Sequence, residues 1–135
     1  MRNITASKVI LFIAGLVAAA VGGANLFVPA EFHATTGITL GDNISLLNEV
    51  RASGGALLAG GILILAGAFR AQLAYISASV ATLIYFGYGL SRLFSMAIDG
   101  TPHTSLVQAA ALEIIVGLAC LYALKSTQTQ QTRMV

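Results

Sequence analysis

An all-α integral membrane protein, a bundle of four transmembrane helices, is the fold class that this 135-residue sequence predicts. Its mean hydropathy is +0.86 and only 9% of its residues are charged, which is far too apolar for a soluble domain of this length. Four long apolar runs follow one another, and each can cross a hydrocarbon core of about 30 Å at about 1.5 Å per helical residue. The predicted spans cover residues 8–30, 45–70, 72–98 and 104–125, and a polar tail occupies residues 126–135.

The connection between the first two spans, about 15–20 residues long, is the one segment with room for structure outside the membrane. Pro29 ends the first span, Glu31 suits the start of a helix and Gly37 suits its end. A short helix lying at the membrane interface is therefore predicted over residues 30–36.

Turn and cap residues fix the order of the other helices. Asp42, Asn43 and Ser45 can each cap the N-terminus of the second span, which is expected to begin near residue 45. Residues 70–72 form so short a turn that spans two and three must be antiparallel, and residues 99–103 join spans three and four. Small residues at four-residue spacing predict close helix packing in lipid. They are Gly15, Ala19 and Gly23 in span one and Ser53, Ala56 and Gly60 in span two.

The distribution of charge predicts that both termini are cytoplasmic. With that orientation the inner ends carry cations and no acid, whereas the outer segments carry four acids. Because Lys and Arg are retained on the cytoplasmic side, the N-in and C-in topology is favoured over its inverse. The inner cations are Arg2, Lys8, Arg70, Lys125 and Arg133, and the outer acids are Glu31, Asp42, Glu49 and Asp99.

Several kinds of chemistry find no support in the sequence. The single cysteine, Cys120, excludes an intramolecular disulfide, and the scattered basic residues form no nucleic-acid footprint. The two histidines, His33 and His103, lie at unrelated outer positions and are interpreted as exposed or interfacial. Neither a metal site nor a haem site is predicted.

Span three carries a stripe of polar side chains on one helix face. Tyr85, Tyr88, Arg92, Ser95 and Asp99 follow a 3-4-3-4 spacing, which aligns them along the helix. Because such groups avoid lipid tails, this face is predicted to point into the bundle and to line a polar pocket that opens to the outer side.

Helix lengths sort the polar residues by depth. Counted from the helix ends, Arg92 falls at the outer boundary and Glu113, in span four, falls close to the midplane. Arg51 also falls at the rim and is interpreted as an ordinary interfacial charge. The candidate binding residues are Asn25, Asn48, Glu49, Tyr85, Tyr88, Arg92, Asp99, Gln108 and Glu113.

Two interpretations stay open for each of the deeper charges. Arg92 either extends to the headgroups or forms an inward ion pair, for which Glu49 and Asp99 are the predicted partners. A carboxylate at the midplane costs about 2.5–3.5 kcal/mol on insertion scales. Glu113 is therefore either a neutral group bonded to a neighbouring helix, for example to Tyr85, or a group that responds to protons or a ligand.

Three short motifs carry a resemblance to a known family. They are NEVRASGG at residues 48–55, GYGLSR at 87–92 and DGTP at 99–102. With these motifs the chain resembles the small four-span membrane proteins grouped as domain of unknown function 4345. The resemblance implies a bacterial inner-membrane protein and no particular activity. In helix number and size alone the chain is also similar to the DoxX-type quinone-linked subunits.

The favoured functional hypothesis is a protein that binds a lipid or another amphiphile, or an accessory subunit of a membrane complex. The alternative is a quinone-linked oxidoreductase subunit, in which Tyr85, Tyr88 and Glu113 relay protons to a bound quinone. A small proton-coupled transporter is less favoured, because span one has no acid. The sequence leaves open whether the protein is an enzyme and whether its partner in the bilayer is another protein or a second copy of the chain.

Overall fold

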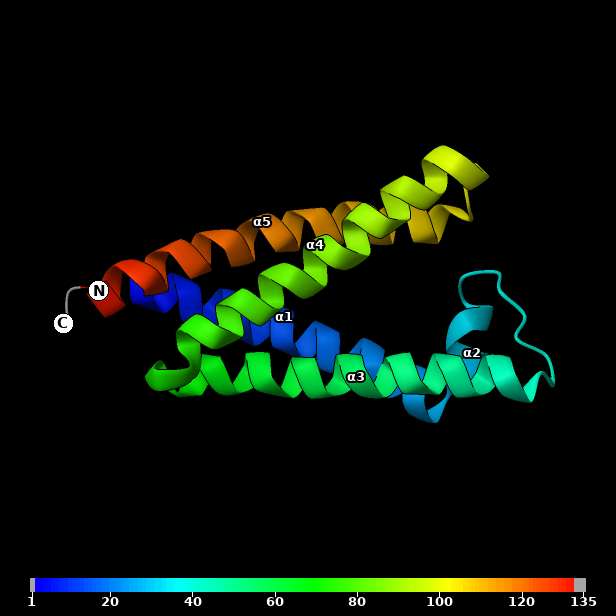
Figure 1. Cartoon of the computed structure of the whole chain (residues 1–135), viewed down its shortest axis with the longest axis horizontal. Helices are drawn as coiled ribbons and strands as arrows, with labels where there is room; N and C mark the ends of the chain where they lie inside the picture. Colours follow the sequence, from blue (N-terminus) through cyan, green and yellow to red (C-terminus); the bar gives the residue numbers. More distant parts are fainter. Residues whose placement is uncertain (1, 133–135) are drawn as a thin grey trace.

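The computed structural model describes residues 2–132 of the chain, with the side chains of residues 5–129. All its regular elements are helices, and no strand occurs within that range (Figure 1). The elements are α1 (Arg2–Phe27), α2 (Pro29–Ala34), α3 (Ile44–Phe69), η1 (Ala71–Leu73), α4 (Ala74–Asp99) and α5 (Thr104–Thr132). Four of the helices are long and apolar enough to cross a membrane, so the predicted four-helix membrane bundle is confirmed. Helix α5 continues past residue 125, and the last three residues of the predicted tail lie outside the described part of the chain.

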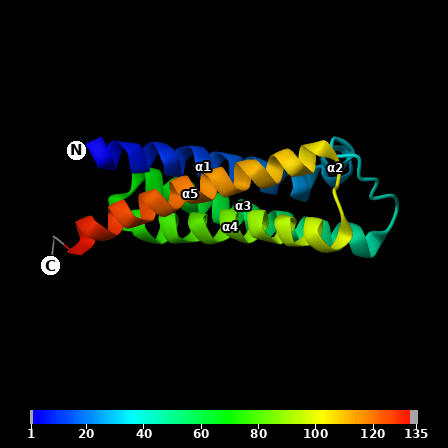
Figure 2. The same ribbon diagram turned by 90° about the horizontal axis from the view of Figure 1, so that it is seen from above.

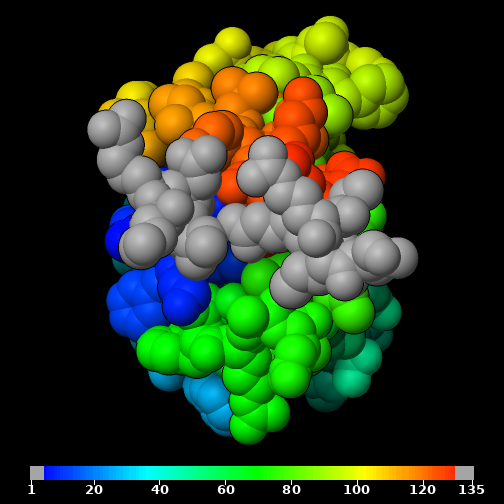
Figure 3. Space-filling view, turned by 90° about the vertical axis from the view of Figure 1, so that its left-hand side faces the viewer, coloured from blue at the N-terminus to red at the C-terminus, as the bar shows by residue number. Residues whose placement is uncertain are grey.

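The four long helices run antiparallel to their chain neighbours (Figures 1 and 2). Both termini and the η1 turn lie at one end of the bundle, which we call the terminal end. Helix α2 and the loop between α4 and α5 lie at the other, which we call the loop end. Figure 3 looks onto the terminal end, where the turn from α3 into α4 occupies much of the surface.

Helices α1 and α3 approach each other closely along a line of glycines. A Cβ built on Gly15 would lie 2.6 Å from the backbone nitrogen of Leu65, and one on Gly54 would lie 2.7 Å from that of Leu26. Gly22 and Gly61 meet the backbone of the opposite helix in the same way. The glycines are seven residues apart on each helix, a spacing typical of a left-handed crossing. The predicted four-residue spacing was wrong at Gly23, which has no neighbour within 4 Å of a built Cβ.

Helix α4 packs against α1 and α3 over its first half and against α5 further along. Ala78, Ala81 and Tyr85 are buried, and the Ser77 hydroxyl donates to the Leu63 carbonyl of α3 at 2.7 Å. Toward the loop end, α4 and α5 together diverge from α1 and α3 (Figure 1). Ser95 and Asp99, at the outer end of the polar stripe, are exposed, so the prediction that the whole stripe faces the bundle is wrong there.

The connection between α1 and α3 folds over the loop end. The predicted interfacial helix is present as α2, and Gly37 follows it with a φ of 75°. Asn43 is the N-cap of α3, where its side-chain oxygen accepts a hydrogen bond from the Leu46 nitrogen at 3.1 Å. Arg51 donates to the Leu26 carbonyl at the C-terminal end of α1, where a cation is favourable. Arg51 therefore fastens α3 to α1 and is more than an interfacial charge.

The outward faces of the four helices are apolar. Large side chains on every long helix are mostly exposed, among them Phe27 (70%), Phe69 (72%), Leu83 (73%) and Ile115 (61%). Apolar surface of this extent on all sides suits contact with lipid tails. The helices are therefore expected to be surrounded by lipid.

Candidate functional site

A cavity of about 350 Å³ lies where the two helix pairs diverge. Its walls come from α1, α3, α4 and α5, and α2 with the following loop contributes Phe32, His33, Thr36 and Ile38. Most of the lining is aliphatic or aromatic, with a few polar groups placed within it. This combination is typical of sites for small organic ligands.

An ion pair between Arg92 of α4 and Glu113 of α5 lies in the cavity wall. The Arg92 Nε donates to both carboxylate oxygens of Glu113, at 2.9 and 3.1 Å. The side chains are 32% and 17% exposed, respectively. The pair brings a full positive and a full negative charge together in a largely apolar setting, where each needs the other to offset its loss of water.

The guanidinium of Arg92 has hydrogen-bonding capacity left over. A guanidinium carries five N–H donors, and Glu113 takes only the one on Nε. Among the residues that the structure describes, neither terminal nitrogen of Arg92 donates a hydrogen bond. These nitrogens can therefore donate to a group that enters the cavity.

Asn25 and His33 form a second polar contact in the wall. The Asn25 amide nitrogen donates to the Val21 carbonyl at 2.9 Å, and its oxygen lies 2.8 Å from the His33 Nε2. Because that oxygen can only accept, Nε2 of His33 carries the proton. In the neutral ring, Nδ1 of His33 is then an acceptor. This contact fixes α2 against α1 beside the cavity.

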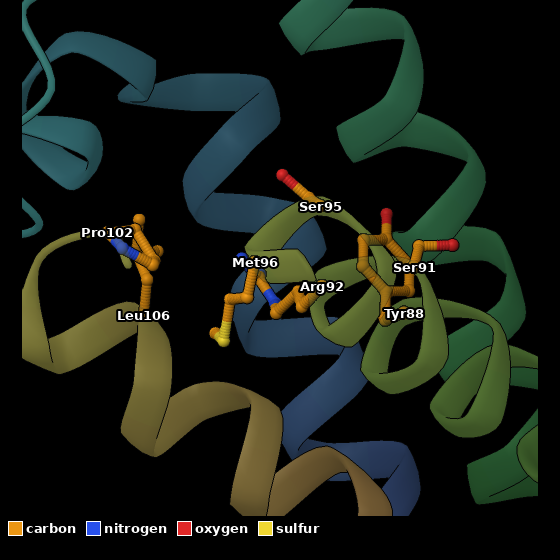
Figure 4. Close-up of a pocket in the computed structure, with 7 residues that line it drawn as sticks. All are labelled: Tyr88, Ser91, Arg92, Ser95, Met96, Pro102 and Leu106. Atoms are coloured by element: carbon orange, nitrogen blue, oxygen red, sulfur yellow. The ribbon is translucent and has the colours of Figure 1, made fainter. Parts of the chain in front are cut away.

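A smaller hollow of about 280 Å³ lies along the outer half of α4 (Figure 4). Tyr88 and Arg92 line both this hollow and the cavity. In Figure 4, Arg92 and Met96 project on the side of Pro102 and Leu106, whereas Tyr88 and Ser91 project on the other side of α4. Leu106 lines both spaces as well, and Arg92 is the charged residue that they share.

The structure brings five of the nine predicted site residues to the cavity. They are Asn25, Tyr85, Tyr88, Arg92 and Glu113. The other four, Asn48, Glu49, Asp99 and Gln108, are exposed and do not line it.

The predicted partners of Arg92 were wrong. Asp99 is bonded to Ser95 one turn away at 3.0 Å, and Arg92 pairs with Glu113 instead of Glu49 or Asp99. Antiparallel pairing explains this, since Arg92 and Glu113 are about equally far along the chain from the α4–α5 loop. The pair shows that Arg92 and Glu113 lie at one level along the bundle, whereas counting from the helix ends had placed them at different levels.

Tyr85 lines the cavity, and its hydroxyl already makes a hydrogen bond. It donates to the Ala14 carbonyl of α1 at 2.7 Å. A phenol has one O–H, so the hydrogen bond from Tyr85 to Glu113, one of the alternatives open for Glu113, is not formed. Its place in the site is that of an aromatic wall.

Sequence reasoning missed the polar groups that α2 and the helix ends contribute. His33, Thr36, Ser53 and Ser105 line the cavity, although none was a candidate. His33 was interpreted as merely exposed or interfacial, but it is half-buried and bonded to Asn25. The short helix predicted over residues 30–36 could have indicated these residues, because a helix that folds back over α1 brings its side chains to the open end of the bundle.

Comparison with known proteins assigns the chain to a family. The model of the family described as "Domain of unknown function (DUF4345)" matches residues 6–124. The chain belongs to the DUF4345 family. No curated protein and no solved structure matches it. The matched region of this DUF4345 protein contains every residue that lines the cavity, including Arg92 and Glu113.

Proposed function

We propose that this integral membrane protein binds a membrane amphiphile, with the polar head of the ligand at Arg92. The observation that carries the proposal is the pair of terminal nitrogens of Arg92 that donate to nothing within the described residues. They lie beside a cavity whose other walls are mostly apolar. A ligand that is part polar and part hydrocarbon complements both features.

Size and surroundings support this class of ligand. A cavity of about 350 Å³ falls at the small end of the usual range for ligand sites, about 300–1,000 Å³. It holds a head group with a short length of chain, and the rest of the chain can lie along the apolar outer faces of the helices. Val17, Leu57 and Ile84 supply apolar contacts within the cavity itself.

We further propose that the protein lies in a bacterial inner membrane with both termini cytoplasmic and the cavity toward the outer leaflet. Lys8, Arg70 and Lys125 belong to the terminal end, where the positive-inside rule expects cations. An impermeant maleimide added to intact cells is expected to label Thr101→Cys, in the loop between α4 and α5, and not Gln72→Cys, in the η1 turn. The inverse labelling pattern would show the opposite topology. Cys120 is buried and should give little background.

Binding can be measured with a single introduced fluorophore, because the chain has no tryptophan. Phe32→Trp places it on the cavity wall. We expect saturable quenching of this variant, in detergent, by a monoacylglycerol or a lysophosphatidate with a brominated chain. Adding Arg92→Gln should weaken the binding about tenfold, since a hydrogen bond to a charged donor is lost.

Two controls separate binding from general contact with the micelle. Phe94 is 68% exposed and lies outside the cavity. The fluorescence quenching of a Phe94→Trp variant should therefore rise in proportion to the added probe. Arg70→Gln removes an exposed arginine from the α3–η1 junction and should leave binding unchanged. Equal, non-saturable quenching of the two tryptophan reporters by both amphiphiles would overturn the proposed function.

A further inference from the structure

We infer that the ligand's head is an uncharged group with a carbonyl acceptor, and that Glu113 weakens the binding of anionic heads. This inference rests on the proposed function and deepens it. Arg92 and Glu113 are the only residues with a formal charge among those that line the cavity, with histidine neutral. The cavity therefore has a net charge of zero before any ligand enters.

Charge balance disfavours an ionic head. An anion bound at Arg92 would leave one uncompensated negative charge in a site set among apolar walls, close to the Glu113 carboxylate. A cation would add an uncompensated positive charge beside Arg92. Ionised groups at membrane depth are tolerated when they are paired, and here the pairing is already complete.

The hydrogen-bonding chemistry of Arg92 then narrows the head group. A guanidinium has donors and no acceptor, so the group it binds has to accept. The uncharged acceptor common in membrane amphiphiles is a carbonyl oxygen, which can come from the ester of a glycerolipid or from the ring of a quinone. The two sources share the same contact with the terminal nitrogens of Arg92.

Glu113 selects the charge of the ligand and acts as neither an acid nor a base. It accepts from the Arg92 Nε and neutralises the guanidinium, and the terminal nitrogens donate to none of the residues that the structure describes. Replacing Glu113 by glutamine keeps the size of the side chain and removes its charge. The cavity then has a net positive charge, and its preference should change from neutral to anionic heads.

Competition for the Phe32→Trp site tests the inference with three probes that share one chain length. They are a monoacylglycerol, which is neutral with a carbonyl, a monoalkylglycerol ether, which is neutral without one, and a lysophosphatidate, which is anionic with a carbonyl. In the otherwise native chain we expect the monoacylglycerol to bind about fivefold more tightly than the ether and about tenfold more tightly than the lysophosphatidate. In Glu113→Gln the lysophosphatidate should become the tightest of the three.

Each outcome has one meaning. A native chain that prefers lysophosphatidate overturns the inference while leaving the proposed function intact, and saturable binding of none of the three overturns both. Equal binding of ester and ether overturns the carbonyl contact. The native ranking needs no charge variant, so the inference stays testable if Glu113→Gln fails to fold. A short-tailed benzoquinone can be added as a further competitor. If it binds more than tenfold more tightly than the monoacylglycerol, the carbonyl is that of a quinone. If the monoacylglycerol binds more tightly, the carbonyl is that of an ester.

Discussion

Replacing Gly22 by alanine is expected to force α1 and α3 apart and to cost the protein about 3 kcal/mol or more of stability. The added Cβ would lie 2.8 Å from the Gly54 carbonyl oxygen and 2.8 Å from the Leu58 Cα, and closer still to the Leu58 nitrogen. These neighbours are backbone atoms, which cannot rotate away as a side chain can. Both helices would have to shift, and the cavity they help to enclose would change with them.

Gly23→Ala is the matched control, since it is the next residue of the same helix. Nothing lies within 4 Å of a Cβ built there. Alanine is a better helix former than glycine by about 1 kcal/mol, so this variant should be as stable as the native chain or slightly more so. Unfolding followed by circular dichroism in detergent measures both. If Gly22→Ala were as stable as Gly23→Ala, the close approach of α1 and α3 would be refuted.

Removing one partner of the Arg92–Glu113 pair is the second change with a large expected effect. Arg92→Leu leaves the Glu113 carboxylate, 17% exposed, without its counter-ion, and should cost about 3 kcal/mol. Glu113→Leu should cost less, because Arg92 is 32% exposed and its long side chain can turn toward water. The double variant removes both charges and should regain most of the loss.

A double-mutant cycle of unfolding free energies measures this coupling. We expect the double variant to be more stable than Arg92→Leu alone, which is the signature of a pair whose members offset each other's burial. Additive losses in the cycle would show that the two side chains do not interact in the folded protein. Asp99→Leu is a suitable comparison, since Asp99 is exposed and, within the described residues, is bonded only to the nearby Ser95.

The architecture of this protein could be predicted from its sequence because hydropathy and turn chemistry are local signals. Four apolar runs defined the long helices, and Asn43 was correctly among the predicted caps of α3. Helix α2 followed from a proline, an acid and a glycine at suitable positions. Each of these features depends on residues close together in the chain.

The polar contacts were harder to predict, because they depend on how helices are aligned with one another. Glu49 was a predicted partner of Arg92, whereas the antiparallel register of α4 and α5 decides that Arg92 meets Glu113. The choice of Gly22 over Gly23 depends on the rotation of α1 against α3, which a pattern of small residues leaves open. The role of His33 required the position of α2 over the cavity mouth.

Native mass spectrometry of the protein, gently extracted from its own membrane, shows whether the cavity beside Arg92 holds an amphiphile. We expect one bound small molecule per chain in the native protein and in Arg70→Gln, and its loss in Arg92→Gln. The mass of that molecule would also identify the ligand. A native chain free of any small adduct, or an adduct retained equally in Arg92→Gln, would contradict the claim.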